Sequence, residues 1–123
     1  EDQFDLCPFT KEIQKHYLSA SVYVMTSAFE GLPLVLVEAE SMGLPLVSYA
    51  CPCGPRDIIT EGKDGFLVEP GDRKTFAARL RTLIEDEDLR RQMGQAAKLN
   101  SERFSLDNVM KQWEALFAEL TAK

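Results

Sequence analysis

Two glutamates, Glu30 and Glu38, stand on either side of a stretch at 31–34 that reads GLPL. A carboxylate can accept hydrogen bonds from two vicinal hydroxyl groups of a sugar. If a phosphate group binds at 31–34, at the start of the helix predicted there, two acids beside it are electrostatically unfavourable unless they bind such hydroxyls. The pattern therefore suits a sugar nucleotide, with one acid on the ribose and the other on the hexose. The residues alone leave a second interpretation open, in which Glu30 belongs to a helix cap and Glu38 to a solvated helix surface.

The phosphate-binding element in this hypothesis is the beginning of a helix. Residues 34–42 (LVLVEAESM) are mostly helix formers, Pro33 suits a first helical turn, and Gly43 suits the position just past a helix end. The first N–H groups of a helix have no internal partners and carry the positive end of its dipole. Gly31 lets a ligand approach the backbone closely. The helix start is therefore a candidate phosphate site, although the sequence contains neither GxGxxG nor a P-loop.

The pentapeptide GLPLV occurs at 31–35 and again at 43–47, and the two copies predict different structures. In the second copy Gly43 ends the helix and Pro45 restricts the residue before it, so a strand is predicted at 46–49. With 21–27 and 66–68, this makes three short apolar strands separated by helices. Such alternation is typical of an α/β fold with a parallel sheet. Because the strands are apolar throughout, helices are expected on both faces of the sheet.

Caps and periodicity predict the remaining elements. Thr10, Asp72 and Ser105 are expected N-caps of helices whose apolar residues repeat at helical spacing. A further helix is predicted at 87–101, and about one helical turn at 56–61. Residues 4–7 (FDLC) alternate weakly and predict a short strand or its remnant. The last helix, which ends the chain, carries an apolar stripe formed by Val109, Trp113, Leu116, Phe117 and Leu120.

Composition argues against several classes of protein. A chain of 123 residues can form one domain, and its net charge of −6 argues against a nucleic-acid partner. Its apolar runs fall short of the roughly 18 residues that a membrane span needs. Three cysteines fit a reducing compartment, so a cytoplasmic location is expected, with the inner face of the membrane as a peripheral alternative. One histidine and three scattered cysteines form a poor ligand set, so no metal and no cofactor are expected.

Residues 27–39 (SAFEGLPLVLVEA) resemble the E-x7-E signature of retaining glycosyltransferases of the group 1 type, family 4, which have the GT-B fold. Residues 43–48 (GLPLVS) resemble the G-x-P-V-V-x strand of that family. Residues 51–59 (CPCGPRDII) resemble its CPxGPxEII loop, with Asp57 in place of the commoner glutamate. Residues 62–68 (GKDGFLV) and the Phe104-Ser105 pair match two later segments. The resemblance covers about residues 10–120 in one consistent order.

The resemblance implies a role for each matching residue. Glu30 would contact hydroxyls of the donor hexose and is the candidate catalytic residue, and Glu38 would hold the nucleotide ribose. Four residues would lie with their backbone against the donor diphosphate and sugar, although the proline has no N–H to offer: Gly31, Leu32, Pro33 and Leu34. The reaction would pass a hexose, most simply from a UDP-sugar, to a cell-surface glycan or glycolipid acceptor with retention and without a metal.

The resemblance also implies missing parts, and the first residue is not methionine. Residues 1–123 are expected to be one fragment of the C-terminal nucleotide-sugar-binding domain. The N-terminal acceptor domain, the first strands and the basic residues that grip the diphosphate would lie upstream, so the fragment alone is expected to be inactive. Strand 21–27 would then be an unpaired edge, which predicts dimerisation or an N-terminal segment that covers it. His16 receives no role, and Arg56 is expected to be solvated.

Two other functions remain open at this point. One is a GT-B relative with different chemistry, such as a sugar-nucleotide epimerase or a phosphorylase. The other is a non-catalytic α/β interaction module with a receiver-like fold, which would need an acidic cluster at the strand ends.

Overall fold

A computed structural model describes residues 3–122 of the chain and shows a small parallel sheet. Its strands are β1 (Tyr23–Met25), β2 (Leu46–Tyr49) and β3 (Gly65–Val68), in the order β1-β2-β3. Val47 of β2 pairs with Val24 on one side and with Phe66 on the other, and both ladders are parallel. The parallel α/β fold that the alternation of elements predicted is therefore confirmed.

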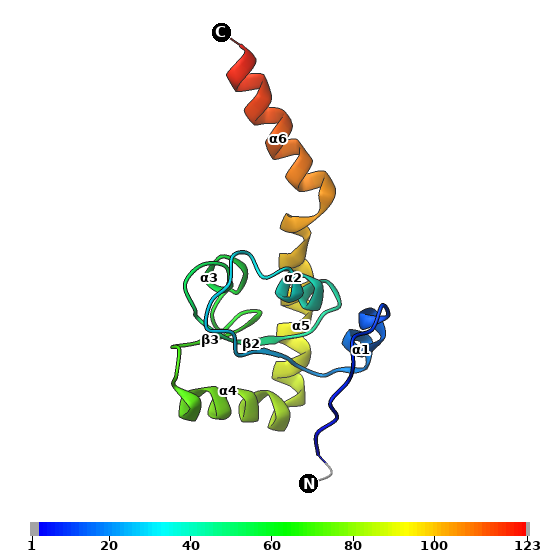
Figure 1. Cartoon of the computed structure of the whole chain (residues 1–123), viewed down its shortest axis with the longest axis vertical. Helices are drawn as coiled ribbons and strands as arrows, with labels where there is room; N and C mark the ends of the chain where they lie inside the picture. The colour runs from blue at the N-terminus through cyan, green and yellow to red at the C-terminus, as the bar shows by residue number, and fades with distance from the viewer. Residues whose placement is uncertain (1–2, 123) are drawn as a thin grey trace.

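Helices cover both faces of the sheet (Figure 1). The elements α1 (Ile13–Ser19), α2 (Leu34–Ser41) and α3 (Pro55–Ile58) contribute to the core on one face. On the other face lies α4 (Arg73–Glu85), and α5 (Glu87–Ser101) contacts both α2 and α4. A 3₁₀ turn, η1 (Glu102–Phe104), leads into α6 (Leu106–Thr121).

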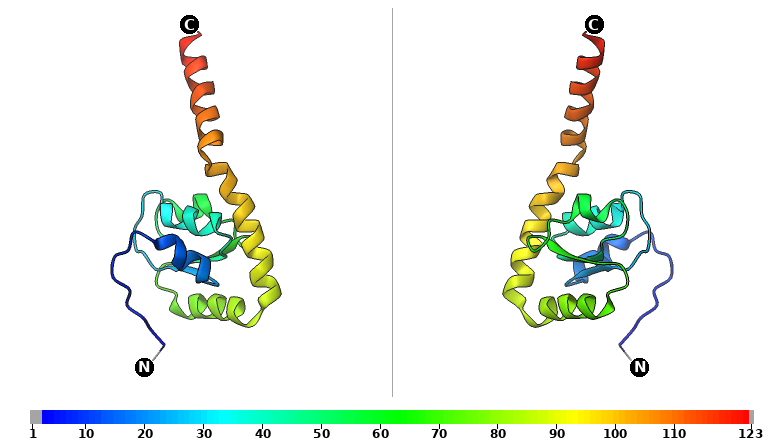
Figure 2. Two further views of the ribbon diagram at one scale, coloured as in Figure 1. Left: turned by 90° about the vertical axis from the view of Figure 1, so that its right-hand side faces the viewer. Right: turned by 90° about the vertical axis from the view of Figure 1, so that its left-hand side faces the viewer.

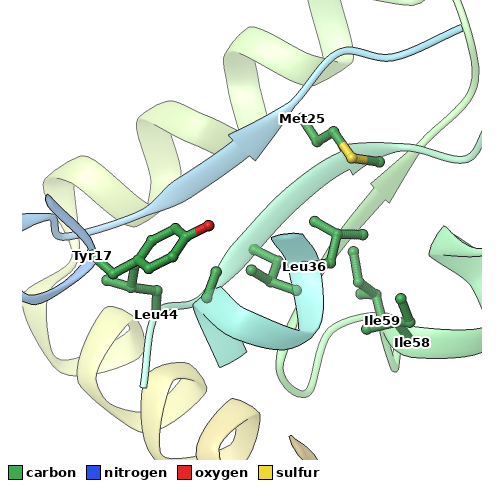
Figure 3. Close-up of a cluster of buried hydrophobic side chains, with 8 residues drawn as sticks. Tyr17, Met25, Leu36, Leu44, Ile58 and Ile59 are labelled. Atoms are coloured by element: carbon green, nitrogen blue, oxygen red, sulfur yellow. The ribbon is translucent and has the colours of Figure 1, made fainter. Parts of the chain in front are cut away.

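The strands supply side chains to two separate cores, as strands with both faces covered must. Leu46 of β2 packs with Leu36 of α2 and Ile58 of α3 in the first cluster (Figure 3). Its neighbour Val47 packs on the opposite face with Phe76 of α4. This alternation explains why the strands read as continuous apolar runs and confirms the prediction of two helical layers.

The junction between α2 and α5 depends on two glycines. Gly43 ends α2 with φ +77°, the left-handed conformation typical of a helix C-terminus. A β-carbon on Gly94 of α5 would lie 2.3 Å from the carbonyl oxygen of Gly43. The second GLPLV copy thus ends one helix, lets another approach closely and then forms β2, as its flanking residues predicted.

Several predicted boundaries are confirmed and others are shifted. Asp72 accepts from the N–H of Thr75, and Ser105 accepts from that of Asn108, so both are N-caps. Thr10 is not one, because α1 begins only at Ile13; the Thr10 hydroxyl accepts from the N–H of Glu12 instead. Pro33 precedes α2 as its N-cap residue, with ψ 92° outside the helical region.

The prediction of a strand at 4–7 is wrong. This segment is irregular, and its apolar side chains Phe4 and Leu6 are exposed because no sheet neighbour covers them. Within the described residues β1 pairs only with β2, and Val24 of β1 is 43% exposed. The N-terminal segment therefore does not pair with this edge, and dimerisation through it remains a prediction.

The last helix leaves the body of the protein. Figure 2 shows α5, η1 and α6 following one another along one side, with α6 projecting beyond the sheet. The apolar stripe predicted from its spacing exists but is exposed apart from the half-buried Val109, and the rings of its Trp113 and Phe117 lie 5.7 Å apart. None of the helices in residues 3–122 combines the length and the apolar character that a bilayer span requires.

Candidate functional site

The candidate binding loop connects β1 to α2. Parallel strands place the loops that follow them at one edge of the sheet, the edge at which open α/β folds bind ligands. Glu30 is half-buried in this loop, whereas Glu38 lies exposed in the second turn of α2. Between them, Pro33 is buried and Gly31, Leu32 and Leu34 are exposed. The structure thus brings all six predicted site residues into one loop and helix start.

The loop that follows β2 supports this binding loop from behind. Gly54 has φ +77°, and a β-carbon on it would lie 2.3 Å from Cδ of Pro33 and 2.5 Å from the carbonyl oxygen of Gly31. The N–H of Gly54 donates to Oδ2 of Asp57 at 3.2 Å, which fixes the start of α3. Asp57 therefore has a structural role in holding this turn.

Two tyrosines stand beside Glu38. The hydroxyl of Tyr17 in α1 donates to Oε2 of Glu38 at 3.0 Å, and the ring of Tyr23 in β1 lies 5.8 Å from that of Tyr17. Burial raises the pKa of Tyr23, and the carboxylates of Glu38 and Glu30 raise it further. Both glutamates therefore act electrostatically on the same phenol.

Sequence reasoning missed these tyrosines, although a signal was present. Tyr17 shares one face of its helix with Ile13 and Leu18, and a buried tyrosine usually needs a partner for its hydroxyl. The carboxylate of Glu38 is that partner. Which acceptor the hydroxyl would reach depended on how α1 packs against α2, and the helical spacing of α1 says nothing about that.

A cleft of about 630 Å³ opens next to Glu38. Phe9 of the N-terminal segment, Tyr17, Tyr23 and Val35 contribute to its walls, and Glu38 lies among them. The walls are mainly apolar, with a carboxylate and phenolic groups as polar points. Such a cleft suits a flat, partly apolar group that carries hydroxyls close by.

Within the described part of the chain, neither of two basic side chains, Arg56 and His16, has a contact that points to phosphate binding. Arg56 is exposed and forms an ion pair with Glu69 at 2.7 Å, so its predicted solvated position is confirmed. His16 is exposed on α1 and borders the cleft on the side of the N-terminal segment. The candidate anion-binding groups in the described loop are thus the backbone N–H groups at the start of α2.

Known proteins with similar sequences share this region. The family described as "Glycosyl transferases group 1" matches residues 1–100. The amylovoran biosynthesis glycosyltransferase AmsD of Erwinia amylovora is 37% identical over 113 residues, which are 92% of this chain and 32% of AmsD. An exopolysaccharide phosphotransferase of Streptomyces coelicolor is 38% identical over 123 residues, which are 99% of this chain and 13% of that protein. The chain thus spans a third or less of the length of these relatives.

A solved structure shares the fold as well. The Anabaena protein Alr3699/HepE in complex with UDP superposes with a TM-score of 0.83 and 26% identity, over 90% of this chain and 31% of that one. The same Anabaena protein is also known in complex with UDP-glucose. The fold class expected from the motifs is confirmed by this likeness. On the match over residues 1–100, the chain belongs to the group 1 glycosyl transferases.

Proposed function

We propose that this chain is the donor-binding part of a retaining glycosyltransferase of family 4. The observation that carries the proposal is the arrangement of Glu30 and Glu38 around the exposed start of α2, at the sheet edge where open α/β folds bind ligands. Carboxylates on both sides of a helix start suit a ligand with a phosphate centre and hydroxyls at both ends. A nucleoside diphosphate sugar has this chemistry.

The proposed ligand extends along the site in one direction. Its ribose binds Glu38, its hexose binds Glu30, and its diphosphate faces the backbone of 31–34. The cleft beside Glu38 then receives the base, because its aromatic and aliphatic walls suit a flat ring. A UDP-sugar is the proposed donor, which is supported by the UDP and UDP-glucose complexes of the Anabaena protein.

In this function the residues of the chain bind and orient the donor. Negative charge develops on the departing diphosphate, and N–H groups already in place at the start of α2 stabilise it. Glu30 holds the hexose so that the anomeric carbon faces the acceptor, and transfer proceeds with retention and without a metal. Gly54 holds the loop from behind, so these groups keep their positions between turnovers.

The acceptor and the rest of the enzyme are part of the same proposal. The acceptor is a cell-surface glycan or glycolipid, in line with the name of the Erwinia relative, which refers to amylovoran biosynthesis. It binds through a domain outside these 123 residues, and the whole enzyme works in the cytoplasm. The isolated chain is therefore expected to transfer no sugar.

Replacement of Glu38 by alanine is expected to weaken the binding of UDP about tenfold or more. The reason is the loss of a charge-assisted hydrogen bond to the ribose, which is worth about 1.5–3 kcal/mol. Calorimetric titration of the 123-residue chain with UDP measures the effect. Glu114→Ala, which removes an exposed glutamate of α6, is the matched control and should bind UDP like the unmodified chain. Equal affinity of Glu38→Ala and the unmodified chain would exclude the ribose role.

A further inference from the structure

In the pair formed by Tyr17 and Glu38, a buried phenol donates a hydrogen bond to an exposed carboxylate. The side chain of Tyr17 is only 5% exposed, and its hydroxyl donates to Oε2 of Glu38 at 3.0 Å. Glu38 itself is exposed and borders the cleft. The two residues are 21 positions apart, so the hydrogen bond also joins α1 to α2.

The donor in this pair is held firmly. The Tyr17 ring packs in the same core cluster as Leu36, Leu44 and Met25 (Figure 3). It also lies next to the ring of Tyr23, at an interplanar angle of 59°. An exposed glutamate on a helix normally samples several rotamers, and fixing them costs conformational entropy. A fixed donor on Oε2 restricts this sampling before any ligand arrives. Within residues 3–122 no protein donor contacts the other oxygen, Oε1.

Burial and the neighbouring carboxylate keep Tyr17 a hydrogen-bond donor. Burial raises the pKa of Tyr17, and the hydrogen bond to Glu38 and its negative charge raise it further. Tyr23 faces the same carboxylate, and its pKa is also raised, first by burial and then by Glu38 and Glu30. His16 borders the cleft from the same helix as Tyr17. At neutral pH the phenol therefore keeps its proton and donates the hydrogen bond that the Glu38 carboxylate accepts.

We infer that Tyr17 is a positioning residue for nucleotide recognition: it fixes the Glu38 carboxylate so that Oε1 accepts hydrogen bonds from the ribose hydroxyls. This inference rests on the proposed function. It assigns part of the discrimination between ribose and a sugar without hydroxyls to a residue that forms no hydrogen bond with the ribose itself. Removal of the phenolic hydroxyl should therefore reduce this discrimination while leaving contacts to the base and the diphosphate intact.

The test compares UDP with 2′,3′-dideoxy-UDP on the 123-residue chain. The unmodified chain should bind UDP more tightly than the dideoxy analogue. Tyr17→Phe keeps the ring in the core and should weaken UDP binding about three- to tenfold, with dideoxy-UDP binding unchanged. Tyr49→Phe is the matched control, because Tyr49 packs against Phe76 on the opposite face of the sheet. It should leave both affinities as they are.

The outcomes separate the inference from the proposed function. If the unmodified chain discriminates between the two nucleotides and Tyr17→Phe discriminates equally well, the inference is wrong and the proposed function stands. If the unmodified chain binds UDP no better than dideoxy-UDP, both are overturned.

Discussion

Replacement of Gly54 by alanine is expected to lower the free energy of unfolding by about 3 kcal/mol or more and to weaken UDP binding. Two costs combine at this position. A non-glycine residue at φ +77° is strained by about 1–2 kcal/mol, and overpacking in a tight contact costs about 1–3 kcal/mol. The new methyl would meet Cδ of Pro33 at 2.3 Å and the backbone oxygen of Gly31 at 2.5 Å, and neither belongs to a flexible side chain. Relief of the clash must therefore move the candidate binding loop.

Alanine variants at two other glycines allow the cost of backbone strain to be measured apart from the cost of overpacking. Gly62 has nearly the same φ, +75°, but a β-carbon added there would find nothing within 4 Å, so Gly62→Ala should cost only about 1–2 kcal/mol. Gly31→Ala meets nothing within 4 Å either and should hardly change stability, but its methyl would stand where the ligand approaches. Urea denaturation and UDP titration of the three variants measure both effects. Equal losses of stability at Gly54 and Gly62 would show that the loop contact contributes nothing.

The sequence was sufficient to predict the elements that depend on local chemistry. Asp72 and Ser105 cap helices where short-range rules place caps, and Gly43 takes the left-handed conformation that a helix end favours. The two copies of GLPLV were correctly separated because proline and glycine restrict the backbone in any context. The parallel order of the strands followed from their alternation with helices.

Errors arose where partners decide the outcome. Residues 4–7 alternate weakly, as a strand would, but a strand needs a neighbour, and β1 stays unpaired on that side within the described residues. The stripe on α6 exists as its helical period predicts, and most of it lies exposed, a point on which the period gave no prediction. Periodicity reports which residues share a face of a helix, and it does not report whether anything packs on that face.

The residues of the candidate site also fall into two groups, those that the sequence predicts and those that only packing brings to the site. Glu30 and Glu38 were found because they flank a helix start along the chain, which is a local relation. Tyr17 and Gly54 reach the site from other elements, and only the packing of α1 on α2 and of the β2–α3 loop on the β1–α2 loop brings them there. These supporting residues decide how precisely the two glutamates are held.

A second carboxylate of α2, Glu40, has a very different environment from Glu38. It is fully buried, with 0% of its surface exposed, and Oε1 accepts from the side-chain amide of Asn100 at 3.0 Å. Its Oε2 has no partner within the described residues, and the buried Asp64 nearby also leaves one oxygen without a partner there. Burial raises the pKa of Glu40 to about 7; the charge of Asp64 adds to this rise, while Asn100 and Arg103 oppose it.

This raised pKa makes stability fall as pH rises. In the unfolded chain Glu40 ionises near its ordinary pKa of 4.5, whereas in the folded chain it keeps its proton up to about pH 7. Between these values the folded state binds more protons, so the free energy of unfolding decreases with pH and stays low above pH 7. The difference of the two pKa values corresponds to about 3 kcal/mol. Burial raises the pKa of Asp64 as well, which acts in the same direction.

Replacement of Glu40 by glutamine is therefore expected to stabilise the chain by about 2–3 kcal/mol at pH 8 and to change little at pH 5. The amide oxygen can still accept from Asn100, while no charge remains to be buried. Urea denaturation at both pH values measures the effect, and Glu114→Gln on the exposed surface of α6 should leave stability unchanged at both. A glutamine variant that is less stable than the unmodified chain at pH 8 would mean that the ionised Glu40 is held by favourable contacts, and that the cost of its burial is offset within the fold.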